Sequence, residues 1–310
     1  MAVLIVGSLA YDSIETPAGA VTNALGGSAT YGGLACQFHL KRLGMDTSAA
    51  IVGVVGEDFA DTDREVLHNA GLDLTGLETV PGSTFRWEGG YAGSMGEAET
   101  KATHLNVFEH FEPRVPASIA QPNVLFCANL HPALQHQVMD QTQAKGITML
   151  DSMNLWINIA RDELLSAMER ADLVIINDGE ARMLTGDDHL PRAMMALAEM
   201  TSTSTLVVKR GEHGVLALHD GAWLALPAFP AIELVDPTGC GDSFAGTLAA
   251  HVAANGGHLT RPVLAAALEA ANVTASFTLQ SFGTGGVVAL SETAYEARLA
   301  EYRAMMAQQR

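Results

Sequence analysis

Short apolar runs, many of them β-branched, recur along the chain and end at a glycine or a polar residue. Strands buried on both faces of a parallel sheet have this pattern, because helices cover both faces and no polar face alternates with the apolar one. Such runs lie at residues 3–6, 124–127, 148–150, 173–176, 206–208 and 232–235. The pattern predicts a strand at each of these places.

Segments with helical spacing lie between the predicted strands. The clearest cover residues 31–43, 178–184 and 243–254. Each is followed closely by a glycine that can end a helix. Because strands that alternate with helices are typical of α/β proteins, we predict a doubly wound, mostly parallel sheet with helices on both faces.

Two stretches, at about 14–24 and 79–108, fit this alternation poorly, because glycines separate their aromatic and polar residues. We predict that they form a small β-sheet lid. No internal repeat and no Ser/Pro-rich or charged linker marks a boundary. Residues 1–310 are therefore expected to form a single domain, with the lid as an excursion from it.

Polar residues follow several of the predicted strands. Ligands of doubly wound sheets bind at the carboxyl ends of the strands, where the loops converge. Asp151, Asn177, Lys209 and Asp236 are expected to lie along that edge.

Charge and composition exclude several classes of function. Asp and Glu together number 35 against 17 Lys and Arg, for a formal net charge of -18. Such a surface repels nucleic acid and anionic lipid, so we expect neither as a partner. No apolar run is long enough to span a membrane, and residues 1–8 lack the basic leader of a secretory signal. Three cysteines without C-x-x-C spacing indicate a reducing compartment, and we expect the protein to be cytoplasmic.

Residues 236–242, which we call the phosphate cradle, join the predicted strand at 232–235 to the helix at 243–254. They read Asp-Pro-Thr-Gly-Cys-Gly-Asp. Free N–H groups at a helix start attract an anion, and Gly239 and Gly241 let the backbone approach it without a Cβ in the way. Asp242 would then face a substrate hydroxyl whose proton it can accept. The alternative for Asp242 is an ordinary carboxylate that stabilises the start of a helix.

The cradle resembles the signature D-T-x-G-A-G-D of the ribokinase-like (PfkB-type) carbohydrate kinases, which is followed by a helix with F-x-G. The matching positions are Asp236, Thr238, Gly239, Gly241, Asp242, Phe244 and Gly246. Residues 6–12, 26–27 and 52–58 resemble the family as well. The resemblance implies an ATP-dependent kinase that transfers the γ-phosphoryl group to a hydroxymethyl oxygen of a sugar, a sugar phosphate or a nucleoside.

The resemblance also implies roles for individual residues. Asp242 would be the base, and the amides of Gly239, Cys240 and Gly241 would form an anion hole for the charge on the migrating phosphoryl group.

Two cations are implied in the same way. Asn177 and Glu180 resemble the N-x-x-E element that orders Mg²⁺ through its waters. On spacing alone, these two residues would be an N-cap and an early acid of a helix. Asp236 is expected beside a monovalent cation such as K⁺, together with backbone oxygens near Thr238 and the loop at 276–286.

The acceptor is expected to bind at Asp12, which follows the first strand, and at Gly26, Gly27 and Ser28. A carboxylate suits this role because it can accept hydrogen bonds from two hydroxyls. Residues 26–31 read Gly-Gly-Ser-Ala-Thr-Tyr and lack the lysine and the asparagine of the ribokinase element G-G-K-G-x-N. This departure leaves the identity of the acceptor open.

ATP is expected to bind a second set of residues implied by the resemblance. Residues 207–214 resemble the strand and turn that hold its phosphates, and the alternative for them is a β-hairpin with a surface lysine. The residues assigned to ATP in addition to Asn177 are Lys209, Gly211, Gly214, Thr238 and Gly283.

Several alternatives stay open. Tyr31, Phe85 and Trp87 could stack on a purine, as in an adenosine-type nucleoside kinase, or serve as hydrophobic packing. A Rossmann-type dehydrogenase is disfavoured because no G-x-G-x-x-G follows the first strand. A non-catalytic ligand-binding homologue is disfavoured by the intact Asp242 and Glu180. The family resemblance also suggests a homodimer that pairs through the lid.

Overall fold

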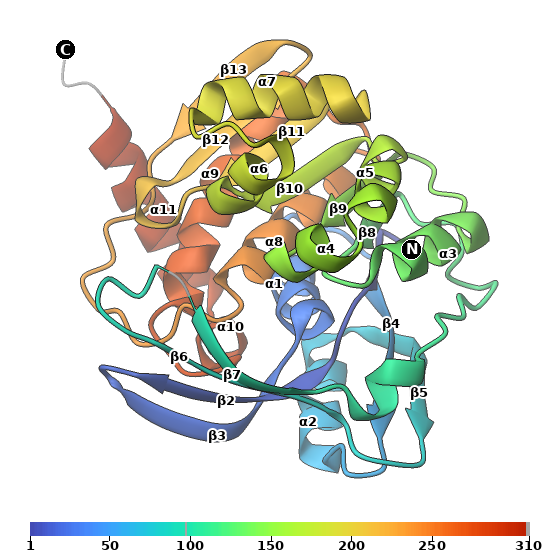
Figure 1. Ribbon diagram of the computed structural model, residues 1–310. Coiled ribbons are helices and arrows are strands. Elements are labelled where there is room, and N and C mark those ends of the chain that lie inside the picture. The colour runs from blue at the N-terminus through green and yellow to red at the C-terminus, as the bar shows by residue number, and fades with distance from the viewer. Residues whose placement is uncertain (97, 308–310) are drawn as a thin grey trace.

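A nine-stranded sheet forms the centre of the computed structural model, which describes residues 1–96 and 98–307 (Figure 1). The strands, in sheet order, are β13 (Ala222–Leu226), β12 (Val215–His219), β11 (Thr205–Lys209), β10 (Leu173–Asn177), β9 (Ile147–Asp151), β8 (Val124–Cys127), β1 (Val3–Val6), β4 (Ala49–Gly56) and β5 (Asp73–Val80). All neighbours pair in parallel except β12, which is antiparallel to both β11 and β13. The predicted mostly parallel sheet is confirmed.

Helices cover both faces of this sheet, as predicted. One face packs against α1 (Ser28–Arg42), α2 (Asp61–Ala70), α8 (Cys240–Ala254) and α9 (Arg261–Thr278). The other packs against α3 (Pro132–Gln141), α4 (Asn154–Ile159), α5 (Arg161–Glu169), α6 (Asp178–Thr185) and α7 (Leu190–Thr201). Neighbouring strand residues point to opposite faces, so Ile5 joins the core on the α1 and α8 side while Leu4 joins the core on the α3 side.

Helices α1 and α8 cross at close range, and both begin at the carboxyl edge of the sheet. A Cβ at Gly246 would come within 2.0 Å of the carbonyl oxygen of Gly32, so only glycine fits at this crossing. Both helices begin three residues earlier than predicted, at Ser28 and Cys240. Their first turns therefore include residues of the predicted acceptor and phosphate sites.

A separate four-stranded sheet lies beside the large one (Figure 1). This second sheet has the order β3 (Gly19–Gly26), β2 (Ala10–Thr16), β6 (Phe85–Tyr91) and β7 (Ala98–His104). The prediction of a small sheet from these two parts of the chain is confirmed, although its boundaries differ. Strand β2 begins at Ala10, residues 79 and 80 belong to β5, and residues 106–110 form a 3-10 helix, η1 (Asn106–His110).

The strand predicted at 232–235 is wrong. These residues form an irregular segment between β13 and α8, and Ile232 is 98% exposed. The amides of Val235 and Asp236 donate to the carbonyl of Leu279, at the end of α9, at 2.9 and 3.1 Å. An apolar run forms a strand only where a neighbouring strand offers hydrogen bonds, and here the hairpin of β12 and β13 already ends the sheet.

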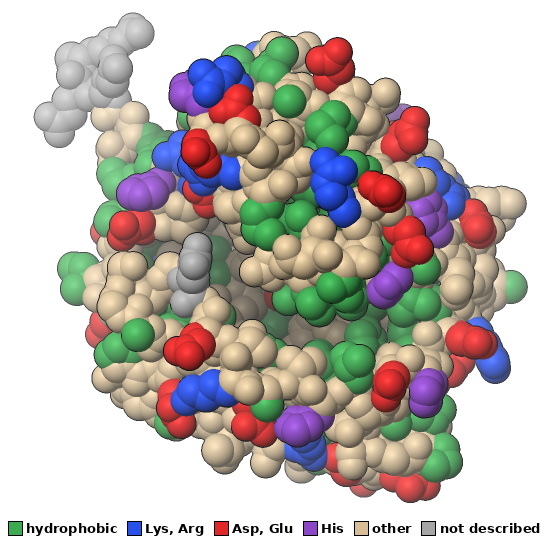
Figure 2. Space-filling view, viewed as in Figure 1, with side chains coloured by type: hydrophobic (Ala, Val, Ile, Leu, Met, Phe, Trp, Pro, Cys, Tyr) green, Lys and Arg blue, Asp and Glu red, His purple; other side chains and the backbone are tan. Residues whose placement is uncertain are grey.

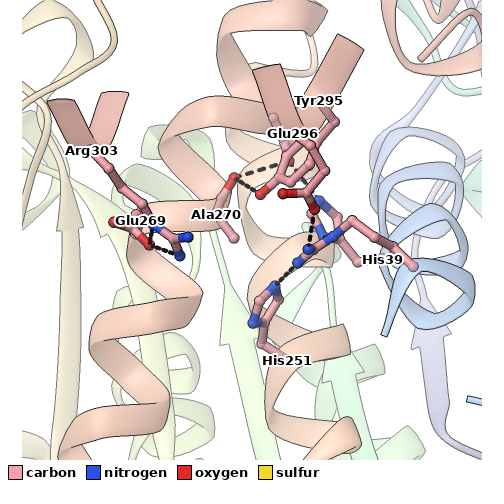
Figure 3. A network of polar contacts seen from close by, with 9 residues as sticks. His39, His251, Glu269, Ala270, Tyr295, Glu296 and Arg303 are labelled. Carbon is pink, nitrogen blue, oxygen red and sulfur yellow. Dashed lines mark hydrogen bonds and ion pairs between the residues drawn. The ribbon is translucent and has the colours of Figure 1, made fainter. Parts of the chain in front are cut away.

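The last helix, α11 (Glu292–Met306), follows the short α10 (Gly285–Val288) and packs against α9. Polar contacts join it to the rest of the fold (Figure 3). Arg303 pairs with Glu269 of α9 at 2.6 Å, and Glu296 pairs with Arg42 of α1 at 2.7 Å. Arg42 also lies within hydrogen-bond distance of the buried His39 and of the partly buried His251. Among the described residues, no helix is both long and apolar enough to cross a membrane.

Candidate active site

The carboxyl ends of the central strands carry the polar residues expected there. Asp151, Asn177 and Lys209 are the last residues of β9, β10 and β11, and Asn177 and Lys209 are register partners. Helices α4 and α6 begin shortly after β9 and β10. Figure 2 shows that this face is hollowed between the second sheet and these two helices, in the region where Figure 1 shows α1 and α8. A ligand that enters the hollow therefore approaches the strand ends.

The phosphate cradle is a turn held by Asp236. This buried carboxylate accepts hydrogen bonds from the amide of Thr238 at 2.9 Å and from the amide of Gly283 at 3.0 Å. Gly239 is the N-cap of α8, with a φ of 76° in the left-handed region that favours glycine. The two bonds of Asp236 thus fix the cradle against the loop that follows α9.

Two of the three predicted anion-hole amides are free to bind a ligand. Within the described part of the chain, no protein group accepts from the amides of Gly239 or Gly241. The amide of Cys240 donates to the carbonyl of Pro237 at 3.2 Å, so it is used within the turn. Free amides at the start of a 15-residue helix form an anion site together with the helix dipole.

Asp242 lies in the first turn of α8 and is partly buried. Burial raises the pKa of its carboxyl to about 6. The charge of Asp151 adds to this shift, while that of Lys209 opposes it. No side chain among the described residues donates to this carboxylate. It therefore combines a free carboxyl with a pKa just below neutral, which suits a general base.

Asp12 belongs to β2 of the second sheet and is 4% exposed. Burial, with smaller contributions from the charges of Asp236 and Asp242, raises the pKa of its carboxyl to about 8. Gly26 makes room for this carboxyl, since a Cβ there would lie 2.0 Å from its Oδ2. The charges of Asp12 and Asp242, from the second sheet and from α8, therefore lie near enough to influence each other.

We expect Asp12→Asn to raise the stability of the ligand-free protein at pH 8. The raised pKa means that folding favours the protonated carboxyl, so stability falls as the pH rises from about 4 to about 8. A change of one in a pKa corresponds to about 1.4 kcal/mol, and we expect a gain of at least about 2 kcal/mol at pH 8.

Urea unfolding at pH 5 and pH 8 checks this expectation. The advantage of the asparagine variant must be larger at pH 8. An equal difference at both pH values, or a more stable wild type at pH 8, would show that burial does not strain the ionised Asp12.

Gly27 and Ser28 connect the loops around the acceptor site. Gly27 is the N-cap of α1 with a φ of 96°, and a Cβ there would lie 2.5 Å from the carbonyl oxygen of Ser8. The hydroxyl of Ser28 accepts from the amide of Ser8 at 3.1 Å and lies 3.3 Å from the hydroxyl of Ser8. Ser28, a predicted acceptor ligand, thus also fixes the loop after β1 to the start of α1.

Residues 205–219 form the β-hairpin that the sequence offered as the alternative to an ATP site. Lys209 is nevertheless not a surface lysine. Its Nζ lies 2.8 Å from Oδ2 of Asp151, which is almost fully buried. Burial alone would lower the pKa of Lys209, but the charges of Asp151 and Glu180 raise it above its ordinary value. A Cβ at Gly241 would lie 3.0 Å from this Nζ, so the ammonium group lies directly beside Gly241.

Asn177 and Glu180 form a capping box at the start of α6. The side chain of Asn177 accepts from the amide of Glu180 at 2.8 Å, and Glu180 accepts from the amide of Asn177 at 2.9 Å. Burial raises the pKa of Glu180 to about 7, with Lys209 acting in the opposite direction. The N-cap and early helix acid that spacing alone predicts are therefore present. The same arrangement holds the buried carboxylate of Glu180 near Lys209.

The glycines assigned to ATP lie in two loops. Gly211 and Gly214 are in the turn between β11 and β12, where η2 (Gly211–His213) lies, and both have positive φ. A Cβ at Gly211 would meet nothing within 4 Å. Gly283, with a φ of 56°, donates to Asp236. Gly211 and Gly214 thus lie directly beyond Lys209, and Gly283 directly beside the phosphate cradle.

Tyr91 is a residue of this region that the sequence did not single out. It ends β6 of the second sheet, and its hydroxyl accepts from the hydroxyl of Thr238 in the cradle at 3.2 Å. Burial raises its pKa. Only its place in a segment predicted to form a lid could have suggested this contact, because 147 positions separate the two residues.

The three aromatic residues considered for purine stacking contact the protein itself. Tyr31 is 1% exposed. The ring of Phe85 stacks on Phe108 with centroids 5.3 Å apart. Trp87 donates from Nε1 to the hydroxyl of Thr100 on β7 at 3.2 Å. These contacts correspond to the packing alternative.

The oxygen donors present bear on both predicted cation sites. In residues 1–96 and 98–307, no cluster of three or more His, Cys, Asp or Glu side chains is arranged to hold a metal ion directly. The carboxylate of Glu180 still suits a contact with Mg²⁺ through water, because it is buried near Lys209, the lysine assigned to the phosphates of ATP. Both oxygens of Asp236 already accept from amides, so a monovalent cation there would need backbone carbonyls as its other ligands.

Each comparison with known proteins finds kinases. A family model described as "pfkB family carbohydrate kinase" matches residues 2–289. A cytidine kinase of Thermococcus kodakarensis is 27% identical over 254 residues, which are 78% of this chain and 85% of that protein. A nucleoside kinase of Burkholderia thailandensis, solved in complex with inosine, superimposes with a TM-score of 0.78 at 20% identity, over 97% of each chain. A fructokinase of Vibrio cholerae, solved with fructose, ADP and calcium, gives 0.76 at 18% identity, over 96% of this chain and 98% of that one.

Proposed function

Because this chain belongs to the pfkB family of carbohydrate kinases and is a phosphotransferase, we propose that it transfers the γ-phosphoryl group of ATP to a hydroxymethyl oxygen of a sugar or a nucleoside. The observation that carries the proposal is the start of α8, where the free carboxyl of Asp242 lies beside the free amides of Gly239 and Gly241. Phosphoryl transfer needs a positioned nucleophile and donors for the phosphoryl oxygens, and this arrangement supplies both.

The acceptor would be held and activated by two carboxyl groups. Asp12 accepts hydrogen bonds from acceptor hydroxyls, and Asp242 takes the proton of the reacting hydroxyl. The acceptor oxygen then forms a bond to the γ-phosphorus as the bond between that phosphorus and the bridging oxygen of ADP breaks. Charge on the phosphoryl oxygens is stabilised by the amides of Gly239 and Gly241 and by the nearby ammonium of Lys209.

ATP would lie along the ends of β10 and β11, with Lys209, Gly211, Gly214, Thr238 and Gly283 around it. Bound Mg²⁺ would neutralise phosphate charge, held through water by Asn177 and Glu180. A K⁺ ion next to Asp236 would add positive charge behind the cradle. Asp236 itself keeps the cradle in place through its two amide bonds.

Two classes of acceptor remain in the proposal because the relatives divide between them. The cytidine kinase and the inosine complex favour a nucleoside, whereas the fructokinases favour a sugar. A panel of pentoses, hexoses, their phosphates and nucleosides, including fructose, cytidine and inosine, tests the proposal. We expect ADP release that depends on one acceptor class. Release that no acceptor stimulates would contradict the proposed activity.

A further inference from the structure

Arg298 of α11 contacts the two chain segments that meet at the base of the phosphate cradle. Its guanidinium donates to the hydroxyl of Ser276, near the end of α9, at 3.1 Å and to Oε1 of Gln280, just beyond that helix, at 2.9 Å. Its Cζ lies 3.5 Å from the ring centroid of Phe277 in α9 and 5.2 Å from that of Phe229, on the segment between β13 and α8. One side chain of α11 thus joins these two segments.

The same two segments hold the cradle in place. Phe229 lies on the irregular segment that runs into Asp236, the first residue of the cradle. The amides of Val235 and Asp236 donate to the carbonyl of Leu279 at the end of α9. Asp236 in turn accepts from the amide of Gly283, in the loop after α9. The position of the cradle therefore depends on the position of the end of α9.

A guanidinium group is well suited to fix the end of a helix. Its donors lie in one plane, so two hydrogen bonds define an orientation as well as a distance, and bonds from a charged donor are stronger than those between neutral groups. Its flat face also packs against aromatic rings, as it does here on Phe277. Ser276 is 4% exposed and itself donates to the carbonyl of Val273 at 2.6 Å. Arg298 therefore reaches a buried and already ordered part of α9.

The contribution of the cradle to a reaction depends on where its free amides lie. The amides of Gly239 and Gly241 stabilise charge only within hydrogen-bond distance of the phosphoryl oxygens in the transition state. Misplacing such groups by about 1 Å can lower a rate about 10²-fold. Helix α11 lies beyond residues 2–289, the part of the chain that the family model matches. The contacts of Arg298 therefore involve an element outside the family match.

We infer that Arg298 is a positioning residue for phosphoryl transfer. It holds the end of α9, and through Leu279 and Asp236 it holds the phosphate cradle where the free amides reach the migrating phosphoryl group. Arg298 acts through these contacts and not on the substrates themselves. The inference rests on the proposed kinase activity, and it gives α11 a role in the reaction in addition to its packing against α9.

The test compares Arg298→Met with Arg303→Met, using an acceptor that the wild-type protein phosphorylates in the panel above. Both arginines lie on α11 and contact α9, but Arg303 pairs with Glu269 in the middle of that helix (Figure 3). For Arg298→Met we expect kcat to fall about ten-fold, because the cradle amides lose their exact placement. The KM of the acceptor should stay within two-fold. Arg303→Met should leave both values unchanged when all proteins are measured well below their unfolding midpoints.

Gln280→Met gives a second test that leaves α11 intact, and because Gln280 is only partly buried this variant should fold even if Arg298→Met does not. Its kcat should also fall, and the double variant should lose no more than Arg298→Met alone, since both changes break the same contact. If kcat stays within two-fold of wild type in both single variants, or falls equally in Arg303→Met, the inference is wrong while the kinase activity stands. A wild type that phosphorylates no member of the panel would overturn both.

Discussion

Replacing Asp242 with asparagine is expected to lower kcat by about 10³-fold, within the range that general bases contribute. The amide of asparagine has nearly the size of the carboxyl but cannot take a proton from the acceptor. The free amides of Gly239 and Gly241 are backbone groups and stay in place, so the affinity for ADP should change little. Acceptor-dependent ADP release measures kcat, and calorimetric titration measures ADP binding.

The pH dependence gives an independent check on Asp242. With its pKa raised to about 6, the carboxyl loses its ability to accept a proton as the pH falls through 6. The wild-type rate should therefore decrease below that pH, and the decrease should disappear in Asp242→Asn. Asp187→Asn, at a half-exposed acid just before α7, serves as the control and should leave kcat unchanged. A kcat within ten-fold of wild type for Asp242→Asn would exclude this residue as the base.

For Lys209→Met we expect the free energy of unfolding to fall by about 3–5 kcal/mol, the usual cost of removing one partner from a buried ion pair. Lys209 Nζ lies 2.8 Å from Asp151, whose side chain is 3% exposed. Without the ammonium group, no cation of the described residues lies near the buried carboxylates of Asp151 and Glu180. Each must then be protonated or carry a buried charge that destabilises the folded state. Urea unfolding at pH 7.5 measures the loss.

The double variant Lys209→Met with Asp151→Asn separates charge from packing. It removes the carboxylate that was left unpaired, so it should recover much of the stability lost in the single variant. Arg192→Met, which breaks the exposed pair with Asp187, should have no measurable effect. The single variant Asp151→Asn completes the comparison. If the losses of unfolding free energy in Lys209→Met and in Asp151→Asn added up to the loss in the double variant, the two side chains would not be coupled.

The central strands and the phosphate cradle could be predicted because their signals are local. A strand covered on both faces reads as an apolar run, as at residues 3–6, and a glycine turn that opens a helix has a short pattern. The capping box of Asn177 and Glu180 was also visible as an alternative, since its two members are three residues apart.

Features that depend on distant partners could not be predicted. Lys209 can be largely withdrawn from solvent because Asp151, 58 positions away, neutralises it, whereas the local pattern allowed a surface lysine. Residues 232–235 have the composition of a strand, but the fold provides no neighbouring strand for them. The sequence left Tyr31 open between stacking on a ligand and packing, and only its contact with Gly239, from the other end of the chain, places it beside the phosphate cradle.

The place of β1 in the middle of the large sheet bears on how the protein is made. The chain contains β1 more than 200 residues before α8 and α9, which cover one side of it. The nascent chain therefore carries an uncovered apolar surface through most of its translation, and such surfaces promote aggregation. Contacts between segments this far apart in the chain also slow folding. Newly made chains should depend on chaperones until α8 leaves the exit tunnel.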